Sequence, residues 1–343
     1  MSKYVLLKKS NLNDFITKLS SAQKVVAPIA KGYNQFAFEQ VTEAQEVALQ
    51  YIPTILPPKK FFMPQCETIQ EFNKNEKTWA PVLDDEELVI FGVHTCDLAG
   101  IQFLNTVMGS DPKDANYLNR KEKITVIGLE CNDYCDEYAS CAVMRNHLPD
   151  GGYDLFLTEL ADDFIVHVAS EKGEKIVADT GCFEDADDAA QAQLKDLRAK
   201  KEEIFKCEVD VANEDLKPLF TKSFESPVWE DVGKRCVTCG NCTAVCPTCY
   251  CFDIRDELNL DFNTGIRYRV WDGCQSENFA KVAGNENFRE ERDARQRHRY
   301  MRKFNYPVTK YSQYACTGCG RCSRTCMAKI NLKETINAIA KDV

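Results

Sequence analysis

The chain is poor in histidine and lacks several common signatures of catalytic and nucleotide-binding sites. Its four histidines are scattered (His94, His147, His167, His298), which argues against a histidine-based catalytic site. No strand-like segment is followed by G-x-G-x-x-G, and neither G-x-x-x-x-G-K-[ST] nor H-E-x-x-H occurs. The sequence therefore has no motif for binding a dinucleotide, for cradling a nucleoside triphosphate or for zinc-dependent proteolysis.

Long apolar segments and an excess of positive charge are also missing. No run approaches the roughly 18 apolar residues that cross a bilayer, so membrane attachment would require a partner. The formal net charge of −10 argues against a general nucleic-acid binder. The chain begins without a secretory signal and contains 18 cysteines, which favours a reducing compartment. We therefore expect a cytoplasmic protein.

Cysteine is abundant, and eight of the 18 cysteines form two runs, each spaced C-x2-C-x2-C-x3-C. In this spacing three thiolates from one loop bind three irons of a cubane, and the fourth reaches a neighbouring cubane. We therefore predict two [4Fe-4S] clusters with crossed ligands. Cluster 1 is held by Cys236, Cys239, Cys242 and Cys326, and cluster 2 by Cys316, Cys319, Cys322 and Cys246. The alternative is zinc, but structural zinc sites use four ligands and have no need of these additional cysteines.

The first half of the chain alternates strand-like and helix-like segments, which predicts an α/β domain. At 343 residues we expect two domains, 1–230 and 231–343. The expected strands are 4–7, 25–29, 88–93 and 124–129, with a hairpin formed by 153–160 and 164–169. The expected helices are 12–20, capped by Asn11, 98–108, and a surface helix or linker within 184–206.

The second domain is expected to be mostly α-helical and ferredoxin-like, with a long insertion between Cys246 and Cys316. The insertion contains a basic stretch in an otherwise acidic protein: Arg289, Arg292, Arg295, Arg297, Arg299, Arg302 and Lys303. One interpretation is a solvated helix face. The other is that these cations neutralise cluster charge or dock an acidic partner surface.

Four further cysteines follow the two strands 88–93 and 124–129. They are Cys96, Cys131, Cys135 and Cys141. If the strands are parallel neighbours, these thiols meet at one edge of the sheet and form a third cluster site. Alternatively, some are buried apolar thiols. His94 is interpreted as a core or supporting histidine able to donate to a cluster sulfur.

The remaining six cysteines receive weaker interpretations. Cys249, Cys251 and Cys274 are expected to pack near the clusters and tune their potential. Cys66, Cys182 and Cys207 are isolated, and we assign them no role.

Several segments resemble the beta subunits of cytosolic sulfhydrogenase-type NiFe hydrogenases and, more distantly, the A subunits of anaerobic sulfite reductases. The matching segments are GVHTCDL, IGLEC, YDLFLTEL, CPTCYC, RVWDGCQ and AGNENFRE with the arginines that follow. They span most of the chain in the family's order. Two departures are Met327, where a ferredoxin run usually has proline, and the wide spacing of Cys135 and Cys141, where the family commonly has C-x-C.

The resemblance implies a subunit that holds only iron-sulfur clusters. In that family it stands between a flavin subunit that binds NAD(P) and a catalytic subunit, here a hydrogenase or a heterodisulfide-reductase-like or sulfite-reductase-like partner. We therefore expect a non-catalytic electron-transfer subunit of a hetero-oligomer. One rival is an enzyme with a substrate at an open N-terminal cluster, and another is a zinc-stabilised scaffold.

Overall fold

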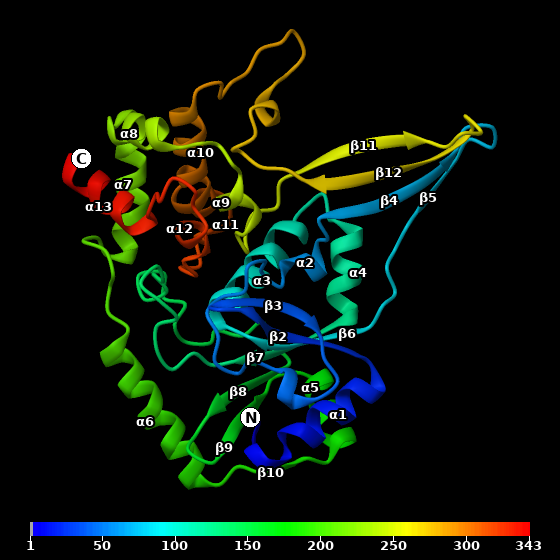
Figure 1. Ribbon diagram of the computed structural model, residues 1–343, viewed down its shortest axis with the longest axis vertical. Coiled ribbons are helices and arrows are strands. Elements are labelled where there is room, and N and C mark those ends of the chain that lie inside the picture. The colour runs from blue at the N-terminus through cyan, green and yellow to red at the C-terminus, as the bar shows by residue number, and fades with distance from the viewer. Residues whose placement is uncertain (1–2) are drawn as a thin grey trace.

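The computed structural model describes residues 3–343, and its centre is a mixed eight-stranded sheet (Figure 1). Strands β2, β6, β7 and β8 form a parallel core, and the flanking strands pair antiparallel. Across the sheet the order is β10 (Phe183–Asp185), β1 (Lys3–Lys8), β9 (Asp163–Val168), β8 (Leu155–Glu159), β7 (Ile124–Leu129), β6 (Leu88–Val93), β2 (Lys24–Gly32) and β3 (Gln35–Gln40). The predicted parallel pairing of 88–93 with 124–129 and the predicted hairpin are confirmed.

Helices cover both faces of the sheet, because the central strands are apolar on both sides. In β6, Val89 and Phe91 pack in the cluster that contains α1 (Leu12–Ala22) and α5 (Glu171–Thr180). The alternate residues Leu88 and Ile90 pack on the other face. That face is covered by α2 (Lys59–Phe62), α3 (Thr95–Met108) and α4 (Ala115–Lys123).

Two local predictions for this domain hold only in part. Asn11 precedes α1 but makes no side-chain capping bond, because it ends a 3-10 turn that leads straight into the helix. The segment 184–206 is not simply a surface helix: it begins in β10, at the edge of the sheet, and continues as α6 (Asp188–Ile204). Ala190 and Leu194 of α6 pack on Ile165, and the Lys201 side chain is buried.

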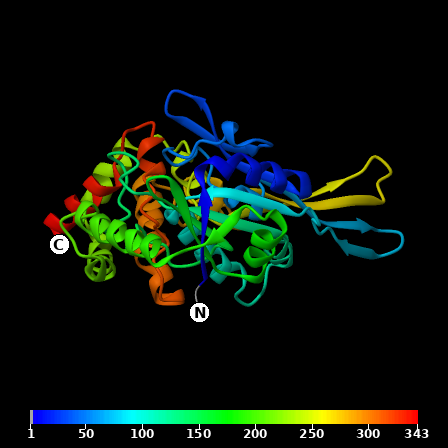
Figure 2. The same ribbon diagram turned by 90° about the horizontal axis from the view of Figure 1, so that it is seen from below.

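A second sheet joins the insertion to the first half of the chain. Strands β11 (Phe252–Leu258) and β12 (Thr264–Trp271) pair with β4 (Cys66–Asn73) and β5 (Thr78–Pro81) in the order β11-β12-β4-β5. This sheet projects from the body as a long arm (Figures 1 and 2). At its base, buried Arg269 binds Glu67 at 2.7 Å and also pairs with Asp114. The insertion is therefore fixed to the α/β half by a shared sheet and a buried ion-pair network.

Helices near the C-terminus gather at the other end of the molecule (Figure 2). Several of them pack around Trp229, Phe220, Tyr300 and Phe304. The helices at this end are α7 (Leu216–Lys222), α8 (Val228–Arg235), α9 (Asn241–Ala244), α10 (Arg292–Phe304), α11 (Tyr306–Tyr311), α12 (Arg321–Arg324) and α13 (Leu332–Asp342). Short 3-10 turns are η1 (Lys9–Asn11), η2 (Ala44–Glu46), η3 (Asn213–Asp215), η4 (Ser223–Glu225) and η5 (Asn278–Ala280). Within 3–343, no helix combines the length and apolarity needed to cross a membrane.

Candidate iron-sulfur centres

The two cysteine runs adopt the same backbone conformation. Thr238 and Gly240 have φ of 52° and 77°, and the equivalent Gly318 and Gly320 have φ of 75° and 73°. In each run the second left-handed residue leads into a one-turn helix, α9 or α12. Equal spacing has therefore produced two equal loops, as expected of two copies of one ligand motif.

The structure brings the fourth cysteine of each run toward the opposite run. Cys246 is a close neighbour of the second run: burial, followed by the neighbouring thiols of Cys322, Cys319 and Cys246, raises the pKa of Cys316. Cys326 packs in the same apolar cluster as Cys236, on the side of the first run. The Asn241 side chain also donates to the Thr325 carbonyl at 3.0 Å. This arrangement is the one that crossed ligation requires.

Helix α10 presents positive charge to these cysteines. Arg295, Arg299 and Lys303 lie four residues apart and are all buried, so the solvated-face interpretation is wrong for these three. Arg299 lies near thiols of both runs: burial lowers its pKa, but nearby Cys242, Cys322 and Cys246 raise it more. Lys303 donates to the Thr248 hydroxyl at 2.8 Å and to the Cys249 sulfur at 3.4 Å.

The buried cations of α10 show whether the surroundings of the two runs suit an anionic cluster. Within 3–343, neither Arg299 nor Lys303 forms an ion pair with a carboxylate, and the Arg299 Nε has no hydrogen-bond partner. A buried charge without a counter-charge is costly. Thiolate-ligated [4Fe-4S] clusters at the adjacent cysteines would supply the missing negative charge. The donor set and its surroundings therefore fit the clusters.

Amide groups also point toward the thiols. The Gln296 side-chain amide donates to the Cys236 sulfur at 2.9 Å, and the Thr238 backbone N–H donates to the same atom at 3.4 Å. On the opposite run, the Ile330 N–H donates to the Cys326 sulfur at 3.3 Å. Hydrogen bonds to cluster sulfurs raise the reduction potential, so these groups would help to set it in clusters bound by Cys236 and Cys326.

The four N-terminal cysteines lie around one pocket. Cys96 is in the first turn of α3, directly after β6, and Cys131 directly follows the neighbouring β7. Cys135 and Cys141 come from the loop after β7, and all four line this pocket. Cys319 of the second run lines it too. The parallel sheet has thus brought the thiols together, and it places them beside the second run.

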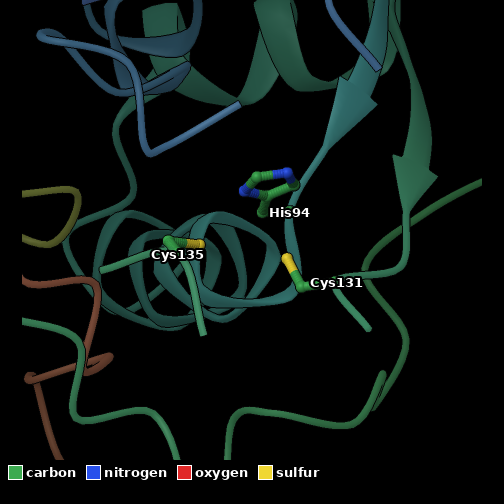
Figure 3. A group of neighbouring side chains, drawn as sticks. All are labelled: His94, Cys131 and Cys135. Atoms are coloured by element: carbon green, nitrogen blue, oxygen red, sulfur yellow. The ribbon is translucent and has the colours of Figure 1, made fainter. Parts of the chain in front are cut away.

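His94 belongs to the same group (Figure 3). One ring nitrogen of His94 and the sulfur atoms of Cys131 and Cys135 all lie within 4.8 Å of one another. The proximity of the Cys131 thiol, and then of the imidazole, lowers the pKa of Cys135, whereas the pKa of Cys131 is raised. Beside these residues a cavity of about 420 Å³ opens between Tyr51, Asn132 and Tyr134.

A buried ion pair connects the N-terminal pocket to the second run. Arg321 follows Cys319 by two residues and binds Asp97, the neighbour of Cys96, through two bonds of 2.6 and 2.7 Å. Its Nε donates to the Thr54 carbonyl at 2.6 Å. Gly318 lies so close to the loop after β7 that a Cβ there would be 2.3 Å from the Ser140 carbonyl oxygen. Sequence reasoning missed Arg321 and Asp97, although both are charged residues next to predicted ligands.

The other cysteines divide into two groups. Cys249, Cys251 and Cys274 line one pocket with His298 and Arg302, next to the first run. Their role in tuning potential stays a prediction. The rest lie away from the pockets that hold the predicted ligands: Cys66 on β4, Cys182 beside Asp14, and exposed Cys207.

Comparison with known proteins agrees with this geometry. Residues 235–330 match the model of the 4Fe-4S dicluster domain, which covers both runs and the insertion between them. Over 338 residues the chain is 34% identical to sulfhydrogenase 2 subunit beta of Pyrococcus furiosus, and the alignment covers 98% of each chain. This similarity extends through the α/β half as well as the cysteine runs. The chain therefore belongs to the family of sulfhydrogenase beta subunits and is an iron-sulfur protein of the 4Fe-4S type.

Proposed function

We propose that this chain is the electron-transfer subunit of a cytoplasmic redox complex, connecting a flavin subunit that binds NAD(P) with a catalytic subunit. The observation that supports the proposal best is the position of Cys319, which belongs to the second run and also lines the N-terminal pocket. The three sets of cysteines consequently lie in series, from the pocket at the sheet edge to the first run. A chain of neighbouring centres is the arrangement that a relay needs.

In this proposal two [4Fe-4S] clusters are held by the crossed sets of the two runs, and a third by Cys96, Cys131, Cys135 and Cys141. Bound clusters supply one-electron oxidation and reduction at potentials set by their surroundings. The chain's own residues position the thiolates, compensate their charge through Arg299 and Lys303, and exclude water from buried Cys96 and Cys236.

The partners follow from the family. The relative's name identifies it as one subunit of a sulfhydrogenase, and we expect this chain also to work in a hetero-oligomer. Cys239 is exposed at the first run, which offers a point of contact for one partner. The cavity beside His94 and Cys131 offers another at the opposite end of the series.

The test is purification of the native complex without oxygen, followed by identification of the attached subunits. We expect a flavoprotein and a catalytic subunit to copurify, and we expect the isolated chain to have no turnover of its own. An isolated chain that turns over a soluble substrate would contradict the relay. Loaded protein with fewer than about eight irons per chain would contradict the two cubanes and favour a scaffold.

The 420 Å³ cavity favours a second candidate, an enzyme with its substrate beside the N-terminal centre. Replacement of Cys135 by serine separates the two functions. Loss of that centre's spectrum indicates that Cys135 is a ligand in a relay. A retained spectrum with lost turnover indicates an open iron that binds substrate.

The neighbouring thiols Cys246 and Cys249 provide a matched pair of variants for the dicluster region. In the Cys246→Ser variant we expect loss or conversion of one cubane, because its fourth thiolate is replaced by a weaker ligand. The Cys249→Ser variant should keep the full iron content, since Cys249 lies outside the C-x2-C-x2-C-x3-C pattern. Iron and sulfide analysis with electron paramagnetic resonance (EPR) of the reduced protein measures both. Loss of iron in Cys249→Ser together with full iron content in Cys246→Ser would instead identify Cys249 as the cluster ligand.

A further inference from the structure

His94 is a buried histidine for which the surrounding protein provides no complete set of partners. Its side chain is only 4% exposed, and Nδ1 has no hydrogen-bond partner within residues 3–343. Leaving a buried polar nitrogen unpaired destabilises the folded protein. A core histidine that served only for packing would gain nothing from this cost. His147 also has an unpaired Nδ1, so the property that singles out His94 is the combination of an unpaired nitrogen with a position beside the Cys131 and Cys135 thiols.

The position of the ring is fixed by its neighbours. His94 lies between β6 and α3, at the edge of the sheet where Cys131 also emerges. Its imidazole stacks on Tyr51 with ring centroids 3.8 Å apart and an angle of 22°. The Tyr51 hydroxyl donates to the Gly92 carbonyl at 2.6 Å, which holds the stacking partner in place. The imidazole is thus held rigidly beside the thiols, as preorganised metal ligands are.

The spacing of the ligand atoms suits direct coordination. In Figure 3 the imidazole lies above the space between the sulfur atoms of Cys131 and Cys135. All three ligand atoms are within 4.8 Å of one another. Bonds of about 2.3 Å to sulfur and about 2.1 Å to nitrogen span at most about 4.6 Å, so a small inward movement of the three atoms would let them share one metal. Cys96 and Cys141 line the adjoining pocket, and one of them would complete a set of four ligands, so that His94 replaces the other in the four-cysteine set proposed above.

We propose that His94 is a direct nitrogen ligand of the metal at the N-terminal centre, which is consequently held by imidazole and thiolates rather than by thiolates alone. The proposal rests on the proposed function for the presence of a metal centre in this pocket. A neutral imidazole in place of a thiolate makes an iron centre less negative and raises its reduction potential. The N-terminal centre would then differ in potential from the two all-cysteine clusters.

The test uses the full chain, reconstituted with iron and sulfide without oxygen after growth on 15N-histidine or on unlabelled histidine. Electron–nuclear double resonance (ENDOR) of the paramagnetic state detects a directly bound nitrogen and changes with the label. We expect a histidine nitrogen coupling in the unaltered protein that disappears in His94→Gln. The His94→Cys variant should keep the metal, lose the nitrogen coupling and titrate at a lower potential. Retention of the metal in this variant separates ligation from a purely structural role.

His147 supplies the matched control. It is also buried, lines the pocket and has an unpaired Nδ1, but its Nε2 is bonded to Glu202 at 3.2 Å. The His147→Gln variant should keep the nitrogen coupling. Loss of the coupling in His147→Gln with retention in His94→Gln would overturn the proposal.

Iron content distinguishes failure of this inference from failure of the proposed third cluster. About twelve irons per chain with a histidine coupling supports both. About twelve irons without a coupling overturns His94 ligation and leaves the third cubane intact. About nine irons with the coupling supports His94 at a single-iron site and overturns the third cubane. About eight irons and no coupling overturns both.

Discussion

Replacing Asp97 by asparagine should lower the free energy of unfolding by about 3–5 kcal/mol, the cost of leaving a buried charge without its partner. Asp97 and Arg321 are both buried, and the guanidinium binds both carboxylate oxygens. Asparagine keeps the shape but removes the charge. Urea unfolding without oxygen, followed by tryptophan fluorescence, measures the loss.

The control is Glu214, which pairs with Arg145 at 2.7 Å on the surface with both side chains about two-thirds exposed. Its replacement by glutamine should cost no more than about 1 kcal/mol. If Asp97→Asn proves too unstable to isolate, the double variant Asp97→Leu with Arg321→Met removes both charges and should recover much of the loss. Equal effects of Asp97→Asn and Glu214→Gln would show that the buried pair has no special importance.

The second large effect is expected at Arg299. Replacement by glutamine should shift the potentials of the two clusters in the runs to more negative values by about 0.1 V. A unit charge about 6 Å away at an effective dielectric constant of about 20 contributes about 3 kcal/mol, which is roughly that shift for one electron. The direction follows because reduction adds negative charge, which the buried guanidinium beside Cys242, Cys322 and Cys246 stabilises. A potentiometric titration monitored by EPR measures the change.

Arg297 provides a control on the same helix. Its guanidinium lies over the Phe224 ring, 4.4 Å from the centroid. Arg297→Gln should leave the potentials nearly unchanged, and Arg299→Lys should retain most of the native value. Equal shifts in Arg297→Gln and Arg299→Gln would indicate a general effect of net charge, and the local explanation would then be wrong.

The features that sequence predicted best are local ones. The spacing of the runs predicted two ligand loops because the ligands lie within one short segment, and the family model confirms the dicluster domain. The apolar strands 88–93 and 124–129 predicted the sheet edge where Cys96 and Cys131 meet. Their assignment as ligands stays a prediction.

The features that sequence missed depend on distant partners. Arg321 and Asp97 are 224 residues apart, and Arg269 and Glu67 are 202 residues apart. No local pattern relates such residues. The basic stretch showed Arg295, Arg299 and Lys303 at one-turn spacing, but the side toward which they face depends on how α10 packs. The sequence predicts His94 only as a core or supporting histidine able to donate to a cluster sulfur, because its position beside two thiols is visible only in three dimensions.

The sheet that joins β4 to β12 has a consequence for synthesis of the chain. At about 5–20 residues per second, the 202 residues between Glu67 and Arg269 take roughly 10–40 s to translate. During that interval β4 has no β12 to pair with. Two arginines bind Glu67 in the folded protein: Arg120 is synthesised early in the interval, and Arg269 only at its end. An unpaired strand edge is prone to aggregation. Production of this protein should therefore benefit from slow expression at low temperature, when fewer half-made chains with this open edge are present together.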